Sequence, residues 1–218
     1  MTLSQRINQG LRQLPSWPLY PVGLLPGGIY FYLAVTNQLG PDPLAVLEHQ
    51  LGELALQFLI LTLAVTPLRK ITGISLLKFR RALGLTAFGY IVLHFLTWVV
   101  LDKQFFWAEI LKDLYKRPYI VVGMTAFLML IPLAATSNNS SIRRLGAVKW
   151  RQIHRLAYVA TLLGAIHYLL LVKSWPPEPI IYILIIVVLL VLRLGTNRVT
   201  TFAIGKIGNR ANPSSHES

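Results

Sequence analysis

The sequence predicts an all-α protein, a polytopic membrane bundle of six transmembrane helices. Hydrophobic residues make up 54% of the 218 residues and charged residues only 13%, which is more apolar than the core of a soluble protein of this size requires. Several apolar runs are long enough for a helix to cross a bilayer, which takes about 17 residues or more. Because these runs are continuous and do not alternate with a period of two residues, we expect helices and not the strands of a membrane barrel.

Six apolar segments, bounded by prolines, glycines or charged residues, are the predicted spans. The first contains prolines and the pair Gly27-Gly28, which a bundle tolerates because neighbouring helices satisfy freed backbone groups. The second is expected to begin earlier, in a helix that starts after Pro43. The third and fifth open on basic residues, the fourth opens on Pro118, and the sixth is almost uninterrupted. The six segments comprise residues 19–39, 54–68, 79–101, 118–136, 151–172 and 179–194.

Chain length leaves room for these spans and little else, so we expect one membrane domain and no soluble catalytic domain. The expected divisions are a cytoplasmic N-terminal segment over residues 1–17, the membrane domain over 18–195 and a cytoplasmic polar tail over 196–218. The N-terminal segment has no apolar stretch before a cleavage site, so no signal peptide is expected. The final residues, NRANPSSHES, are polar and are expected to be disordered.

Basic residues are distributed unequally between the two sides of the predicted bundle. The side that holds the termini carries sixteen of the 21 basic residues, whereas the opposite loops carry five of them and seven of the eight acidic residues. Since cytoplasmic loops carry the excess of Lys and Arg, both termini are expected in the cytoplasm and the protein in the cell inner membrane. The net charge of +13 then reflects topology and attraction to anionic lipid, and nucleic-acid binding is the weaker explanation.

The chain contains no cysteine, which excludes disulfides, thiolate catalysis, iron–sulfur clusters and thiolate-ligated haem. Histidine is therefore the main candidate metal ligand. His94 lies fifteen residues into the third span and His167 sixteen residues into the fifth, so at about 1.5 Å per residue both lie roughly 22–24 Å from the cytoplasmic face. Two neutral imidazoles at equal depth on neighbouring helices suit a six-coordinate haem. We therefore predict His94 and His167 as axial ligands of a haem iron; the alternative is a pair of hydrogen-bonded structural histidines.

A third histidine, His154, lies three residues into the fifth span, near the cytoplasmic surface. At the corresponding depth the third span has Arg80 and Arg81, whose guanidinium groups stay protonated and cannot act as ordinary metal ligands. His154 is thus a candidate for a second haem-related site or an interfacial residue. Arg80 and His94 lie about 40° apart around one helix, so Arg80 could meet a haem propionate or serve only as a positive-inside anchor.

On the opposite side, His49 lies beside Glu48 and Glu53 in the segment DPLAVLEHQLGE. Histidine changes its charge near neutral pH, so His49 is a candidate proton-handling group at a quinol site. The alternative is an interfacial histidine without a chemical role.

Eight segments occur in a fixed order between about residues 40 and 195: GPDPLAVLEHQLGELAL, VTPLRK, FRRALGL, LHFLTW, KRPYI, AATS, KWRQIHRLAYV and AIHYL. Together they resemble the MsrQ (YedZ) family, the haem-binding membrane subunits of a bacterial system that repairs oxidised methionine in periplasmic proteins. That family belongs to the ferric-reductase-like transmembrane group, which holds b-type haem between its third and fifth helices.

The resemblance implies one or two b-type haems, with axial-ligand roles for His94 and His167. It implies a haem-related role for His154 and leaves Arg80 where larger oxidases of the group have a further histidine. It also implies flavin mononucleotide (FMN) as a candidate cofactor, electrons from the membrane quinone pool, and a periplasmic molybdopterin-containing methionine-sulfoxide reductase as the acceptor. The chain is then an electron-transfer subunit that does not carry the substrate-reducing site.

Two other functions remain open from the sequence. One is a stand-alone ferric or cupric reductase, for which Asp42, Glu48 and Glu53 could form an acidic outer surface. The other, of a different class, is a small transporter or scaffold whose histidines are structural or relay protons. A cytochrome b spectrum of the purified protein separates electron transfer from the transporter.

Overall fold

The structure is a computed structural model. It describes residues 2–172 and 176–208, with side chains as far as residue 193. The regular secondary structure of this part of the chain is entirely helical, with no strand. The elements are α1 (Leu3–Gln13), α2 (Leu19–Val35), α3 (Pro43–Thr72), α4 (Arg80–Leu96), the π-helical segment η1 (Thr97–Asp102), α5 (Trp107–Lys116), α6 (Pro118–Ala135), α7 (Asn139–Ile153), α8 (Leu156–Leu171) and α9 (Pro177–Gly208).

The ends of α3 follow from local chemistry. Asp42 caps its N-terminus by accepting a hydrogen bond of 3.0 Å from the Ala45 N–H, and Pro43 occupies the first helical position, where no N–H is needed. At the other end Gly73 adopts a φ of 75° and its N–H donates to the Arg69 carbonyl, which is the left-handed helix stop that glycine favours. The helix therefore begins at Pro43 itself, whereas the sequence predicted a start just after this residue.

The expected all-helical membrane class is confirmed in its coarse form. Within the described residues, α3, the continuous α4–η1 unit and α6 are long and apolar enough to cross a membrane, and α7 with α8 would be a fourth span if the bent pair counts as one. α2 is a shorter apolar helix of 17 residues. The membrane character of the chain is thus established, whereas the expected number of six spans stays a prediction.

The fifth predicted span differs from the structure at its start. The apolar helix α8 begins at Leu156 and not at Arg151, because the polar helix α7 runs to Ile153 and the chain bends by 42° between the two. His154 caps α7, and its N–H donates to the carbonyls of Gln152 and Trp150. The bend follows from composition. Helix α7 carries basic and amide side chains, which are costly to place in lipid, whereas α8 is apolar.

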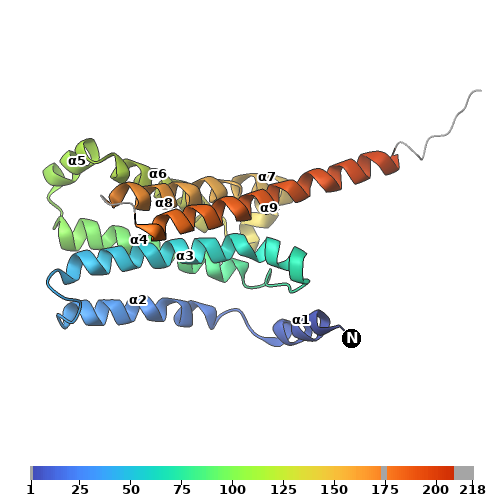
Figure 1. Cartoon of the computed structure of the whole chain (residues 1–218), viewed down its shortest axis with the longest axis horizontal. Helices are drawn as coiled ribbons and strands as arrows, with labels where there is room; N and C mark the ends of the chain where they lie inside the picture. The colour runs from blue at the N-terminus through green and yellow to red at the C-terminus, as the bar shows by residue number, and fades with distance from the viewer. Residues whose placement is uncertain (1, 173–175, 209–218) are drawn as a thin grey trace, which may run out of the picture.

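The long helices lie side by side along one axis, with α5 at one end of the molecule and α1 and α7 toward the other (Figure 1). α3 packs along α4, and α6 packs along α8. α9 covers α3 and α8, and its backbone continues beyond the predicted end of the sixth span, through the first part of the expected tail, to Gly208. The final segment NRANPSSHES, expected to be disordered, lies outside the described residues.

Tyr90 joins α2 to this core. Its side chain is fully buried, and its hydroxyl donates a 2.7 Å hydrogen bond to the Gly23 carbonyl and accepts one of 3.0 Å from the Gly27 N–H. A Cβ atom at Gly27 would lie 2.5 Å from the Tyr90 ring, so only glycine allows this approach. The predicted tolerance of glycine in the first span has this packing reason.

Candidate functional site

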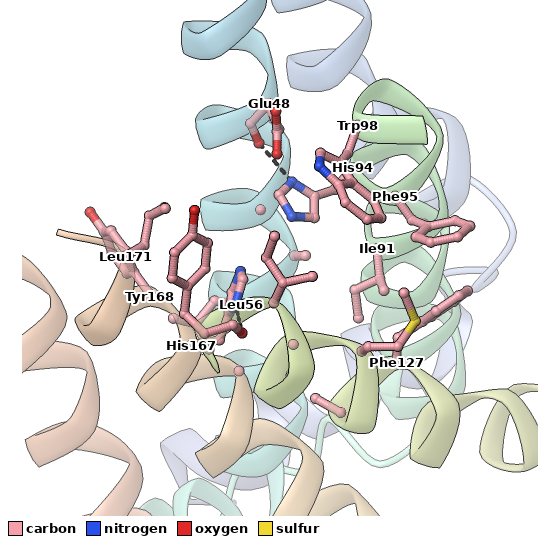
Figure 2. A pocket seen from close by; sticks show the side chains of 18 of the residues that line it. Glu48, Leu56, Ile91, His94, Phe95, Trp98, Phe127, His167, Tyr168 and Leu171 are labelled. Carbon is pink, nitrogen blue, oxygen red and sulfur yellow. Dashed lines mark hydrogen bonds between the residues drawn. The ribbon is translucent and has the colours of Figure 1, made fainter. Parts of the chain in front are cut away.

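A cavity of about 380 Å³ lies between α3, α4, α6 and α8. Its wall is largely apolar, with Leu56, Ile91 and Phe127 among the lining side chains. His94 from α4 and His167 from α8 both line it (Figure 2). The two histidines that the sequence places at equal depth therefore meet at one cavity.

The ring of His94 is held against α3. Its Nδ1 lies 2.8 Å from the main-chain carbonyl oxygen of Glu48, drawn as a dashed line in Figure 2. One helical turn further along α3, a Cβ atom at Gly52 would lie 3.2 Å from the His94 ring. Glycine at this position therefore leaves the space that the imidazole occupies.

His167 is held against α6 in the same way. Its Nδ1 lies 2.7 Å from the carbonyl oxygen of Tyr119, and a Cβ atom at Gly123 would lie 2.7 Å from that Nδ1. Each histidine thus uses a carbonyl and a glycine four residues later on the neighbouring helix. The α3–α4 and α6–α8 pairs build the same arrangement twice.

The two carbonyl contacts determine the tautomer of both rings. A carbonyl oxygen can only accept, so Nδ1 of His94 and of His167 carries the proton and donates it, and in the neutral ring Nε2 then keeps its lone pair. In the described part of the chain neither Nε2 atom has a hydrogen-bond partner. The ring centroids are 6.3 Å apart with an interplanar angle of 77°, so the two imidazoles face one space.

Sequence reasoning missed both glycines and both carbonyls. The available signal was a lone glycine inside an apolar helix, where glycine costs about 1 kcal/mol relative to alanine and so indicates a close approach by another group. The sequence could not identify that group as a histidine ring, because the two partners come from different helices.

His154 lies in the other half of the molecule, at the bend between α7 and α8. Its Nδ1 lies 3.0 Å from the Trp150 carbonyl, its Nε2 lies 3.4 Å from the Ser137 hydroxyl, and its ring stacks on that of Trp150 with centroids 3.9 Å apart. Arg80 is close enough to act electrostatically on His154. The structure therefore brings together the two residues that the sequence placed at one level, and separates them from His94 and His167.

A second arginine, Arg193 of α9, lies near Arg80. The two guanidinium groups repel each other, and Arg193 is buried, with its guanidinium 4.8 Å from the ring centre of Tyr158. From the sequence, Arg193 counts only among the sixteen basic residues on the side that holds the termini. Its position beside Arg80 and Tyr158 depends on how α9 packs.

His49 lies at the margin of the cavity that His94 and His167 line, where α3, α8 and α9 meet. Its Nε2 lies 3.4 Å from the Tyr168 hydroxyl, which in turn donates to Glu178 over 3.4 Å. Beside this chain, the Tyr182 hydroxyl donates to Glu53 over 2.8 Å. The structure thus places His49 and Glu53 in a polar region that adjoins the apolar cavity.

Charged residues at the α5 end connect η1, α5 and the start of α6. Lys103 forms ion pairs of 2.9 Å with Asp102 and 3.0 Å with Asp113, and Asp113 also pairs with Arg117 over 3.2 Å. The hydrogen bond to Asp102, with a smaller contribution from Asp113, raises the pKa of Lys103 above its ordinary value of 10.5. Arg117 in addition donates to the Tyr119 hydroxyl over 3.2 Å, which links this cluster to the residue whose carbonyl holds His167.

The amino-acid sequence of this chain is similar to those of known proteins. The family described as "Ferric reductase like transmembrane component" matches residues 51–165, a range that includes His94 and His154. Proteins named protein-methionine-sulfoxide reductase heme-binding subunit MsrQ, from Brucella ovis, Brucella canis and Brucella suis, are each 52% identical to this chain over 178 residues, which cover 82% of this chain and 80% of each relative. No solved structure matches the chain.

Proposed function

This chain belongs to the MsrQ family, within the ferric-reductase-like transmembrane group, and we propose that it is the haem-binding electron-transfer subunit of a methionine-sulfoxide reductase system. The observation that carries this proposal is the pair His94 and His167, which faces one cavity with both Nδ1 protons already donated to carbonyls. The name of the relatives supports both the cofactor and the enzyme system.

The residues at the cavity suit a b-type haem. With metal–nitrogen bonds of about 2 Å on each side, two imidazoles on one iron have ring centres roughly 6 Å apart, close to the 6.3 Å between His94 and His167. The apolar wall suits the flat macrocycle, and the two free Nε2 atoms suit its iron. A haem held there would supply single-electron transfer.

The protein contributes orientation and ligand strength. The Glu48 and Tyr119 carbonyls keep each ring in the tautomer that can coordinate, and a hydrogen bond at the second nitrogen also raises the basicity of the first. Gly52 and Gly123 allow the rings to lie against the helices that supply these carbonyls. The ligands are thus positioned by two helix pairs before any cofactor binds.

A second, haem-related site at His154 and Arg80 is part of the proposal. His154 has no histidine at its level and lies beside an arginine, so His154 is the one imidazole that this site would offer to a haem. Arg80 supplies a positive charge for a propionate. FMN rests on the family resemblance alone.

The proposed electron path begins in the membrane quinone pool and ends at a periplasmic, molybdopterin-containing catalytic subunit. His49 is the proposed proton-handling group for quinol, since it adjoins the cavity and reaches Tyr168 and Glu178 through hydrogen-bond distances. The proposed topology has six spans over residues 18–195 in the inner membrane, with residues 1–17 and 196–218 in the cytoplasm. This orientation places the α5 end, where the catalytic subunit would dock, in the periplasm.

The stand-alone metal reductase is less well supported. Its candidate acidic surface included Asp42 and Glu53, but Asp42 caps α3 and Glu53 accepts hydrogen bonds from Tyr182 and Gln57. The transporter hypothesis offers no reason for two coordinating tautomers at one cavity.

The test is a redox titration of the purified chain. We expect a cytochrome b spectrum that changes on dithionite addition, reduction by a quinol analogue, and reoxidation by the catalytic subunit from the periplasmic side of oriented vesicles. Colourless protein from cells with ample haem would reject haem binding. Reoxidation by cytoplasmic-side acceptors alone would reject the direction of transfer.

A further inference from the structure

A second cavity, also of about 380 Å³, lies at the end of the molecule that carries α1, far from the histidine pair. It is formed by α1, the last turns of α3 and the loop that follows α3. Three basic side chains line it together with a serine and an asparagine: Arg12, Arg69, Lys78, Ser75 and Asn8. Nothing in the proposed electron path uses these residues.

The cavity is a built feature, because specific hydrogen bonds hold α1 against the loop. The Asn8 side chain donates to the Gly73 carbonyl over 2.8 Å and accepts from the Ser75 N–H over 2.8 Å. The Lys78 ammonium donates to the Arg12 carbonyl over 2.8 Å. Two side chains thus fix the position of the short helix relative to residues that lie more than sixty positions later.

A neighbouring face of α1 is apolar and uncovered. Leu3 and Ile7 fall within about 40° of each other at 100° per residue, and Leu14 follows as the extended residue that caps the helix. Their side chains are 76%, 36% and 55% exposed. A short helix with one apolar face and basic residues beside it is typical of a helix that lies in the membrane interface. That position puts the cavity at the depth of the lipid headgroups.

The described chain supplies no anion to this cavity. Arg12, Arg69 and Lys78 are exposed, and within the described residues none of them forms an ion pair with a carboxylate. All described acidic residues lie in the half of the bundle that holds α5, because they occur in the first part of α3, on η1 and α5, and at the start of α9. They are Asp42, Glu48, Glu53, Asp102, Glu109, Asp113 and Glu178.

We propose that this cavity binds the phosphate headgroup of an anionic phospholipid of the adjacent leaflet. Arg12, Arg69 and Lys78 pair with the phosphate, and Ser75 and Asn8 offer hydrogen-bonding groups beside them. The acyl chains extend along the apolar face of α1 and the lipid-facing side of α3. A bound lipid therefore joins α1 to the bundle at the membrane surface.

The experiment measures lipid retained by the full-length protein in mild detergent, by native mass spectrometry with phosphatidylglycerol or phosphatidylcholine added. We expect one phosphatidylglycerol to bind the unmodified protein at least tenfold more tightly than phosphatidylcholine. The triple variant R12Q/R69Q/K78Q is expected to lose at least tenfold in affinity for phosphatidylglycerol, because each basic residue near a charged membrane surface is worth about fivefold. The matched control R143Q/R144Q/K149Q removes the same charge from α7 and is expected to keep the bound lipid.

A second variant covers the case in which the triple variant does not fold. Ser75→Asp adds a carboxylate inside the cavity while keeping all three cations, and it is expected to expel the lipid. Equal binding of both lipids, equal loss in the α7 control, or retention in Ser75→Asp would overturn the proposal. Displacement of the lipid by millimolar inorganic phosphate would also overturn it, since the site would then recognise a free anion and not a lipid.

Discussion

The imidazole rings of His94 and His167 lie 6.3 Å apart between centroids, and each donates from Nδ1 to a carbonyl of a different neighbouring helix. The rings therefore depend on four helices, two that carry them and two that hold them. A change in any of these contacts should alter the site without removing a histidine.

Replacing the histidines should separate the paired site from His154. Since one imidazole cannot supply both axial ligands, His94→Ala and His167→Ala should each abolish the low-spin haem signal. His154→Ala should keep most of that signal and lower total haem or slow electron entry from the cytoplasmic side. Haem per protein and the spectrum of each variant, at equal expression, provide the measurement. Loss of all haem in His154→Ala with normal low-spin haem in His94→Ala would show that the wrong residues were paired.

Adding one methyl group beside each ring should have graded effects. A Cβ atom would lie 2.7 Å from the ring at Gly123, 3.2 Å from the ring at Gly52, and 3.8 Å from its nearest neighbour at Gly84. We therefore expect Gly123→Ala to shift the haem spectrum and midpoint potential most and Gly52→Ala less. Gly84→Ala should leave both unchanged and is the control, because alanine is the better helix former. A spectrum of Gly123→Ala equal to that of Gly84→Ala would contradict the proposed role of the glycine.

Tyr90→Phe should destabilise the packing of α2 and leave the haem site intact. The substitution removes the hydroxyl that bridges Gly23 and Gly27, and unmaking such buried hydrogen bonds costs about 1–3 kcal/mol. Thermal unfolding should therefore occur several degrees lower, with an unchanged haem spectrum. Tyr32→Phe, at an exposed position of α2, is the control and should unfold like the unmodified protein.

The ion pairs of Lys103 should give a pH-dependent contribution to stability. Its pKa is raised in the folded protein, chiefly by the hydrogen bond to Asp102, so the stabilisation is fully present below the ordinary value of 10.5 and is lost as pH rises through the raised pKa. Lys103→Gln should lower the unfolding temperature at pH 7 to 9, and the difference should shrink above about pH 11. Lys112→Gln, which removes an exposed pair with Glu109, should have little effect at any pH. A Lys103→Gln deficit that stayed constant at high pH would exclude charge as its cause.

Topology can be tested by reporter fusions. The loop that contains Asp102 to Lys116 should face the periplasm, and the one that contains Arg143 to Lys149 should face the cytoplasm, because the second side carries the excess of basic residues. Reporters active on the reverse sides would contradict the orientation, and with it the periplasmic exit of electrons.

The helical membrane class could be predicted from the sequence because it depends on local composition. In lipid an apolar run must satisfy its own backbone, so it becomes a helix whatever its neighbours are. Depth is only partly local: the residue count placed His94 and His167 near one level, although the count for His167 began at Arg151, in α7, and α8 itself begins at Leu156. The start of α3 was predictable to within about one residue because it too depends on local composition.

The tertiary structure decided what depends on contacts between distant segments. The break at His154, the carbonyls of Glu48 and Tyr119, and the glycines beneath the two rings all depend on how α3 packs on α4 and α6 on α8. Burial of Arg193 beside Arg80 and the cavity beneath α1 likewise require the assembled bundle. A hydropathy pattern specifies that a helix crosses the membrane, but the rotation and partner of each helix follow from side-chain packing, which is a property of pairs of segments and not of either segment alone.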